Sequence, residues 1–306
     1  MADKNEISDY LRLPTVELLA AALRRKLSQR GDSFALCGIV NAKSGQCSED
    51  CRFCVQSAHY ATAAPVYGLL AEEELVRAAM EAAAAGAEHF SIVTSGRGLG
   101  GADFERVLGM VAAVRARVGI KVCGSLGILG EKEFARLKAA GMSRYHHNLE
   151  TSAEFFPRIV STHTFAERVE TIAAAQAAGL EVCAGGIFGL GESEADRISL
   201  ALTLSQCRVD SVPLNFLLPQ PGTPLADQSP LRAVEILRAI ALFRLILPSV
   251  AIRLAAGRET AIPDFLSSCF MAGADGMMIG GYLTTRGRSV ARDRQFAAEM
   301  QSLWSS

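Results

Sequence analysis

Several features that mark nucleic-acid-binding, membrane-spanning or secreted proteins are missing from this sequence. The formal net charge is −1 and the pI is about 6.5, and without a long basic stripe the chain offers nucleic acid no electrostatic surface. Even the apolar run 233–247 is interrupted by Glu235, Arg238 and Arg244, so it is too polar to cross a bilayer. The first residues are polar and acidic, unlike a signal peptide. We therefore expect a cytoplasmic protein with neither a nucleic-acid nor a membrane partner.

Internal repeats and low-complexity linkers are also missing, and half of the 306 residues are hydrophobic, which favours one globular domain with a large core. Short apolar segments alternate with amphipathic ones. The apolar segments predict strands over 35–40, 89–94, 121–126, 143–149, 181–188, 210–217, 250–255 and 276–280. The amphipathic segments predict helices over 73–85, 104–118, 132–140, 165–178, 194–207, 233–245 and 263–272. Helix stops are expected at Gly86, Gly141, Gly179 and Gly273.

This alternation predicts the fold class. Repeated strand–helix units favour right-handed crossovers and a parallel sheet. At this length the natural closure is an α/β fold of the (β/α)8, or TIM-type, barrel. We place the barrel at 33–306 as a single domain. The preceding segment, 1–32, is an N-terminal helical extension, whose helix over 16–28 we expect to cap the bottom of the barrel.

Three of the eight cysteines are closely spaced: Cys47, Cys51 and Cys54 have three and then two residues between them. In a reducing cytosol, cysteines favour metal or catalytic use over disulfides. A short loop with this spacing can hold three irons of a 4Fe–4S cube and leave the fourth iron without a protein ligand. Such an open iron can bind a small chelating molecule and pass it an electron. A structural zinc site usually has four closed ligands in paired knuckles, which this run lacks.

The residues around these cysteines, 42–57, resemble the cluster loop of the radical S-adenosylmethionine enzymes and, within that superfamily, of the biotin synthase family. Four further segments resemble that family in its order: 147–152, 183–192, 211–215 and 253–259. The resemblance implies a barrel with a catalytic 4Fe–4S cluster on Cys47, Cys51 and Cys54. It also implies cleavage of S-adenosylmethionine to a 5′-deoxyadenosyl radical.

The resemblance further implies a site for S-adenosylmethionine. Asn148 and Glu150 match the pair that binds the ribose, although the family more often has Asp at position 150. They alternate along the fourth predicted strand, so we expect both to face the same side. Arg168 matches the arginine that pairs with the methionine carboxylate; a solvated helix charge is the ordinary alternative. The full set that matches this site is Phe53, Asn148, Glu150, Arg168, Gly186 and Ile187.

A second set of residues matches an auxiliary iron–sulfur cluster, of 2Fe–2S or a larger 4Fe type. Cys123, Cys183 and Arg253 stand on the third, fifth and seventh predicted strands, at positions that serve this cluster in the family. The family's remaining cysteine, on the second strand, is Ser91 here. Cys37 stands on the first strand, where the family usually has serine. We therefore expect Cys37 to replace Ser91 as a ligand; the alternative is a buried apolar Cys37, with two cysteines and Arg253 sufficing.

The implied reaction is a sulfurtransferase reaction that inserts sulfur into dethiobiotin to form biotin. Asn148 and Asn215 suit the donors and acceptors of a cyclic urea, and the family's substrate carries one. A homodimer and an external electron donor such as flavodoxin or ferredoxin are implied too. Two other readings stay open: another radical enzyme of similar barrel, such as a hydrogenase-cofactor maturase or a methylornithine-type mutase, and a non-catalytic iron–sulfur carrier.

Overall fold

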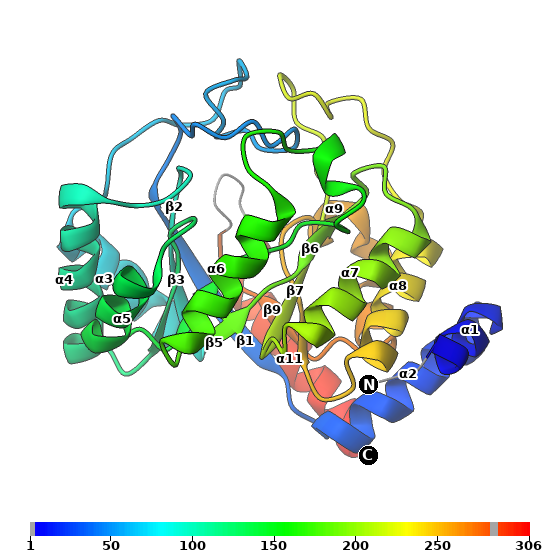
Figure 1. The fold of residues 1–306 in the computed structure, drawn as a ribbon. Helices are drawn as coiled ribbons and strands as arrows, with labels where there is room; N and C mark the ends of the chain where they lie inside the picture. Colours follow the sequence, from blue (N-terminus) through cyan, green and yellow to red (C-terminus); the bar gives the residue numbers. More distant parts are fainter. Residues whose placement is uncertain (1–3, 282–286) are drawn as a thin grey trace.

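A ring of parallel strands forms the centre of the computed structural model, which describes residues 4–281 and 287–306 (Figure 1). The strands are β1 Ala35–Lys43, β2 His89–Thr94, β3 Lys121–Ser125, β4 Arg144–His146, β5 Glu181–Cys183, β6 Gly186–Phe188, β7 Ser211–Phe216, β8 Ala251–Leu254 and β9 Gly276–Met278. Neighbours pair in order from β1 to β5 and from β6 to β9, and β9 pairs with β1. Because β7 pairs with both β5 and β6, these two short strands share one place, and eight places close the ring. The predicted (β/α)8 barrel is confirmed.

Helices surround the barrel and pack on its outer face, whereas the first two helices lie beside its bottom (Figure 1). They are α1 Lys4–Arg12, α2 Thr15–Arg30, α3 Glu72–Ala84, α4 Gly101–Arg117, α5 Glu131–Ala140, α6 Phe165–Ala177, α7 Glu194–Gln206, α8 Ala233–Ile246, α9 Arg258–Ala261, α10 Leu266–Met271 and α11 Val290–Ser305, with 3-10 turns η1 Phe156–Arg158 and η2 Pro263–Phe265. The predicted glycine stops are confirmed, since Gly86, Gly141, Gly179 and Gly273 all have φ between 77° and 107°. Among the described residues, no helix combines the length and apolarity needed to span a membrane.

The structure differs from the sequence prediction in several elements: β4 ends at His146 although a strand was expected over 143–149, and the short helix α9 was not predicted. The strand expected over 181–188 is broken between β5 and β6, where the neighbouring strand comes so close that a Cβ on Gly185 would lie 1.9 Å from the Pro213 carbonyl oxygen. The segment 263–272 divides into η2 and α10. Helices α1 and α11 were not predicted; α1 ends shortly before Pro14, which adjoins the start of α2.

Helix α2 covers one side of the barrel bottom rather than its centre. It packs along α8 and against α10, and its last residue, Arg30, reaches Asp275, which immediately precedes β9. The Asp275 carboxylate is fully buried and accepts hydrogen bonds from the Ile252 backbone N–H (2.7 Å) and Arg30 Nε (2.6 Å). Arg244 of α8, also fully buried, lies 3.3 Å away. One carboxylate thus joins two strands and two helices.

We expect Asp275→Ala to lower the free energy of unfolding by about 3–5 kcal/mol, because it leaves the Arg244 guanidinium buried without its counter-charge. Urea unfolding of the cluster-free protein measures this. Asp9→Ala is the matched control: Asp9 also pairs with an arginine, Arg12, but both side chains are exposed, and such pairs contribute at most about 1 kcal/mol. Equal losses in the two variants would contradict the role of Asp275.

Candidate active site

The three closely spaced cysteines lie in a loop that leaves the C-terminal end of β1, at the top of the barrel in Figure 1. Backbone hydrogen bonds fold this loop back on itself. The Cys47 N–H donates to the Gln56 carbonyl (3.0 Å), the Ala58 N–H donates to the Cys47 carbonyl (2.8 Å), and the Cys54 N–H donates to the Cys51 carbonyl (2.9 Å). The loop therefore presents Cys47, Cys51 and Cys54 from one compact turn, at the mouth where catalytic residues of such barrels gather.

Asp50, between the first two cysteines, fastens this loop to the segment after η1. Its carboxylate accepts hydrogen bonds from the backbone N–H groups of Ser161 (2.9 Å) and Thr162 (3.2 Å) and from the Ser161 hydroxyl. Partial burial opposes ionisation, but these hydrogen bonds outweigh it and hold the pKa of Asp50 at about 2. The Tyr60 hydroxyl donates to the Asp50 carbonyl. Both sides of the loop are thus fixed before any cofactor binds.

Burial favours the protonated form of two of the three cysteine thiols, those of Cys51 and Cys54. Burial raises the pKa of Cys54 to about 11 and raises that of Cys51 further. Bound iron must therefore displace the protons. In the described part of the chain, no three His, Cys, Asp or Glu side chains gather closely enough to hold a single metal ion. A cube spreads its thiolates over separate irons, so a cluster does not require such gathering.

A chain of polar contacts links the cluster loop to Arg168 through two residues that were not predicted. Glu49 lies between the first two cysteines and contacts His163 Nδ1 at 2.5 Å. Arg168 Nε, in the first turns of α6, donates to His163 Nε2 (3.0 Å), and its Nη1 donates to the Asn148 carbonyl (2.7 Å). The position of Glu49 inside the cysteine run was a usable signal. Nothing in the sequence marked His163, which becomes a neighbour only through the fold.

Glu150 reaches this group by a bulge and not by strand alternation, so the reason given for its placement was wrong. β4 ends at His146, and beyond it the N–H groups of Leu149 and Glu150 both donate to the Gly185 carbonyl. This extra residue leaves Glu150 at φ 67°, facing Gly186 across the ladder. Its carboxylate lies 3.8 Å from Arg168 Nη1. Burial raises the pKa of Glu150, while Arg168 and a hydrogen bond with Asn148 oppose the rise.

Phe53 and Ile187, both members of the predicted S-adenosylmethionine set, pack at the edge of one apolar patch. The buried side chains of this patch come from the cluster loop, from the segment around η1 and from the top of the barrel: Cys51, Phe155, Phe156, Ile159, Val160, Leu190 and Leu225, with Phe53 and Ile187 packed at its edge. Gly186, another member of this set, is required by the close approach of the neighbouring strand. A Cβ there would lie 2.4 Å from the Glu150 carbonyl oxygen.

Deeper in the barrel, four predicted auxiliary-cluster residues share one layer. Inward side chains of alternate barrel strands form layers of four. The residues of one layer are found by crossing two neighbouring strands along the paired residues and moving two residues towards the C-terminus on the way. Four such steps that start at Cys37 return to Cys37. The side chains met on this circuit, which we call the cluster layer, are Cys37, Cys123, Cys183 and Arg253.

Contacts within the cluster layer agree with this count. Arg253 Nη1 donates to Cys37 Sγ at 3.0 Å, and Cys183 Sγ donates to Ser211 Oγ at 3.5 Å. Burial raises the pKa of Cys37 and of Cys123, and the guanidinium of Arg253 opposes the rise at both. Three thiols and a cation therefore face one another in the dry interior.

Buried polar atoms without a partner surround the cluster layer. The next layer towards the mouth, which we call the upper layer, contains Ser91, His146, Pro213 and Met278. Ser91 Oγ and His146 Nε2 are buried without hydrogen-bond partners, and so is Arg253 Nε. Such atoms cost about 1–3 kcal/mol each unless something satisfies them. Together with three thiols, they fit a polar, sulfur-rich group held inside the barrel. Ser91 stands one layer above Cys37.

Asn148 lies on the extension of β4 and Asn215 on β7, each one inward position above the upper layer. Each already holds a neighbouring backbone group. Asn148 Oδ1 accepts from the Gly185 N–H (3.1 Å), whereas Asn215 Nδ2 donates to the Gly186 carbonyl (3.2 Å) and its Oδ1 accepts from the Ala256 N–H (3.1 Å). Asn215 thus has the ordinary structural role of a strand amide, which is to cap nearby backbone groups. One N–H of its amide remains for a ligand.

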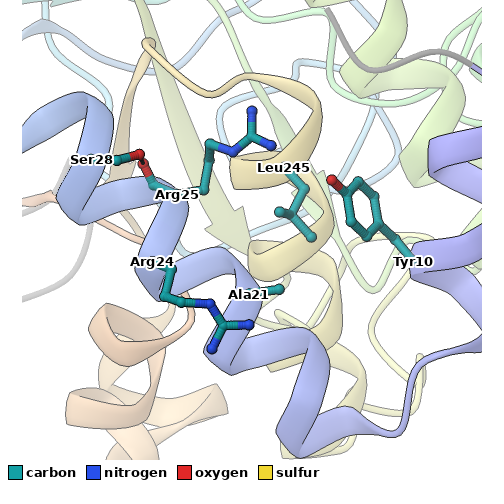
Figure 2. Close-up of a pocket in the computed structure, with 6 residues that line it drawn as sticks. All are labelled: Tyr10, Ala21, Arg24, Arg25, Ser28 and Leu245. Atoms are coloured by element: carbon teal, nitrogen blue, oxygen red, sulfur yellow. Dashed lines mark hydrogen bonds between the residues drawn. The ribbon is translucent and has the colours of Figure 1, made fainter.

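A hollow in the surface lies far from these residues. Figure 2 shows it between α1, α2 and α8, with Tyr10, Ala21, Arg24, Arg25, Ser28 and Leu245 around it. The Ser28 hydroxyl donates to the Arg25 carbonyl there. The hollow holds none of the predicted site residues, and its helices lie beside the barrel bottom.

The sequence and the fold of this chain match known proteins. Residues 43–204 match the radical SAM superfamily, and residues 213–301 match the Biotin and Thiamin Synthesis associated domain. Because the first match covers more than half of the chain, the protein belongs to the radical SAM superfamily.

Sequence relatives narrow this class. The chain is 50% identical over 285 residues to the biotin synthase of Pelotomaculum thermopropionicum, which covers 93% of this chain and 89% of that protein. It is 52% identical over 271 residues to the biotin synthase of Desulforudis audaxviator, with 88% and 82% covered. The chain belongs to the biotin synthase family.

Solved structures of lower identity share the fold. A methylornithine synthase structure superposes with a TM-score of 0.82 at 19% identity, covering 99% of this chain and 96% of that one. An FeFe-hydrogenase maturase from Carboxydothermus hydrogenoformans gives 0.80 at 18% identity, covering 96% and 73%. These are the kinds of radical enzyme that the sequence left as alternatives. They share the barrel, whereas the close sequence relatives are biotin synthases.

Proposed function

We propose that this protein is a biotin synthase that inserts sulfur into dethiobiotin. The observation that carries the proposal is the stacking of two cysteine groups along one barrel axis: the loop of Cys47, Cys51 and Cys54 at the mouth and the cluster layer beneath it. A non-catalytic carrier would leave the polar contacts from Glu49 through His163 to Arg168 without a function.

When bound, the mouth cluster supplies the electron that splits S-adenosylmethionine, and the auxiliary cluster supplies the sulfur. The protein binds, orients and shields. Arg168, held by His163 and the Asn148 carbonyl, would pair with the methionine carboxylate. Glu150 and Asn148 offer an acceptor and an amide to the ribose, and the apolar patch with Phe53 and Ile187 covers the adenine. This arrangement keeps water away from a reactive radical.

The remaining parts of the proposal concern partners and place. Dethiobiotin would lie between the two clusters, with its ureido group at Asn148 and Asn215. An external donor such as flavodoxin or ferredoxin would reduce the mouth cluster. The auxiliary cluster would be held by Cys37, Cys123 and Cys183 beside Arg253, and its iron and sulfide content decides between a 2Fe–2S and a larger 4Fe type. We further propose a cytoplasmic homodimer in which 1–32 is an extension and 33–306 the catalytic domain.

The first prediction concerns the mouth cluster. With S-adenosylmethionine and dithionite, Cys51→Ala should abolish 5′-deoxyadenosine formation, because the cube loses one of its only three protein ligands. Cys207→Ala is the matched control, since Cys207 is a half-buried thiol at the end of α7, and it should form 5′-deoxyadenosine at the normal rate. Substantial cleavage by Cys51→Ala would sink the assignment.

A second prediction separates Cys37 from Ser91 as the auxiliary ligand. Thiolate is a far better iron ligand than a serine hydroxyl. Cys37→Ala should lose auxiliary iron and biotin formation, yet keep the mouth cluster and uncoupled cleavage of S-adenosylmethionine. Ser91→Ala should keep both clusters. Iron and sulfide analysis with a biotin assay measures this. A Cys37→Ala protein with full iron and sulfide that still makes biotin would show that Cys37 is not a ligand.

The third prediction concerns the substrate. Asn215→Ala should raise the Kd for dethiobiotin roughly 5- to 150-fold, the equivalent of about 1–3 kcal/mol for one buried hydrogen bond left unmade. Asn215 also holds the backbone of Gly186, a member of the S-adenosylmethionine set, and of Ala256. Iron content and S-adenosylmethionine affinity are therefore measured in the same samples, and unchanged values show that the loss is confined to the substrate. An unchanged Kd for dethiobiotin argues against the role.

A further inference from the structure

The layer beneath the cluster layer, towards the barrel bottom, is unusually polar. Counting around the ring in the same way gives His89, Arg144, Ser211 and Gly276, which we call the floor layer. Interiors of such barrels are filled mainly by bulky branched residues. Here the floor consists of an imidazole, a guanidinium, a hydroxyl and a glycine. Gly276 is required because a Cβ there would lie 2.6 Å from the Ala35 carbonyl oxygen of the neighbouring strand, and it would also lie 3.1 Å from Arg253 Cγ.

His89 is the least satisfied side chain of this layer. It is 4% exposed, and neither of its ring nitrogens has a hydrogen-bond partner. Arg144 Nη1 is also buried without a partner, although Nε and Nη2 of the same side chain bind Glu181. An imidazole in either neutral tautomer has one N–H to donate and one nitrogen to accept. Leaving both hydrogen bonds of the ring unmade in a dry interior costs free energy, so a group absent from the polypeptide must satisfy the ring nitrogens.

The neighbours of His89 restrict what that group can be. The charged side chains that act on it are Arg144, Arg253 and Lys121, and none of these can accept a hydrogen bond. The His89 N–H therefore needs an acceptor, and the cluster layer directly above offers three cysteine sulfurs and, when loaded, cluster sulfides. Three cationic side chains around one neutral ring also favour an anionic group there.

We propose that His89 is a positioning residue of the auxiliary cluster, whose imidazole N–H donates a hydrogen bond to a cluster sulfur from the floor side. This inference rests on the auxiliary site of the proposed function. Hydrogen bonds to sulfur raise the reduction potential of iron–sulfur clusters, because they stabilise the more negative reduced state. His89 therefore sets how readily the auxiliary cluster accepts an electron, from the face opposite the substrate.

The test is a redox titration of the fully loaded protein, with the auxiliary cluster followed by EPR and Mössbauer spectroscopy. His89→Phe fills the space without a donor and should lower the midpoint potential of the auxiliary cluster while iron and sulfide content stay at wild-type values. His89→Gln restores an N–H donor and should bring the potential back towards wild type. His147→Phe is the matched control. His147 is also a buried histidine, but its ring stacks on Tyr145 outside the layers, so the potential should not change.

Each outcome decides between the possibilities. A loaded His89→Phe protein with a wild-type potential overturns the proposal and leaves the auxiliary site intact. A wild-type protein that binds only the mouth cluster overturns both. If His89→Phe fails to bind the cluster, a His146→Phe protein with ¹⁵N-labelled histidine decides, because His146 also faces the barrel interior beside the cluster layer: a weak nitrogen coupling in the reduced cluster supports the hydrogen bond from His89. No coupling, or a strong one that signals direct iron ligation, overturns it.

Discussion

The offset between neighbouring strands is the constraint on which the rest of this structure depends. A parallel ring closes only if each strand is displaced along the axis relative to the one before it. Here the pairing of Cys183 on β5 with Ser211 on β7 completes the ring. That displacement decides which side chains share a layer. It brings residues from four separate strands, Cys37 to Arg253, to one height although the sequence separates them by more than two hundred positions. The cluster layer and the floor layer both follow from this geometry.

Much of the barrel could be predicted because its signals are local. Apolar runs between glycine-terminated helices give strands without any knowledge of their partners, and β2 has the bounds that were expected. The cysteine loop was equally visible, since its three thiols stand within eight residues. The idea that Cys37 substitutes for Ser91 required only that their strands be neighbours, which β1 and β2 are. Whether Cys37 binds iron stays a prediction.

What the sequence could not provide depends on register and on long-range contacts. The bulge at Glu150 arises because two successive N–H groups share the Gly185 carbonyl, and no local pattern announces such sharing. His163 gains its role only because the segment after η1 folds against the cluster loop, which lies more than a hundred residues earlier. The floor layer is the clearest case: His89 and Arg144 look like ordinary strand residues until the ring is closed and both face inward.

The vertical order of the layers gives the proposed chemistry its direction. From mouth to floor, the axis passes the cysteine loop, the amides of Asn148 and Asn215, the upper layer, the cluster layer and finally His89 and Arg144. A substrate held at the amides would meet a radical from above and a sulfur donor from below, so the two reagents need not exchange places. The polar floor then lies on the far side of the sulfur donor, where hydrogen bonds can tune its electronics without touching the substrate. Separation of the two sides follows from the register alone, since no loop movement is required to create it.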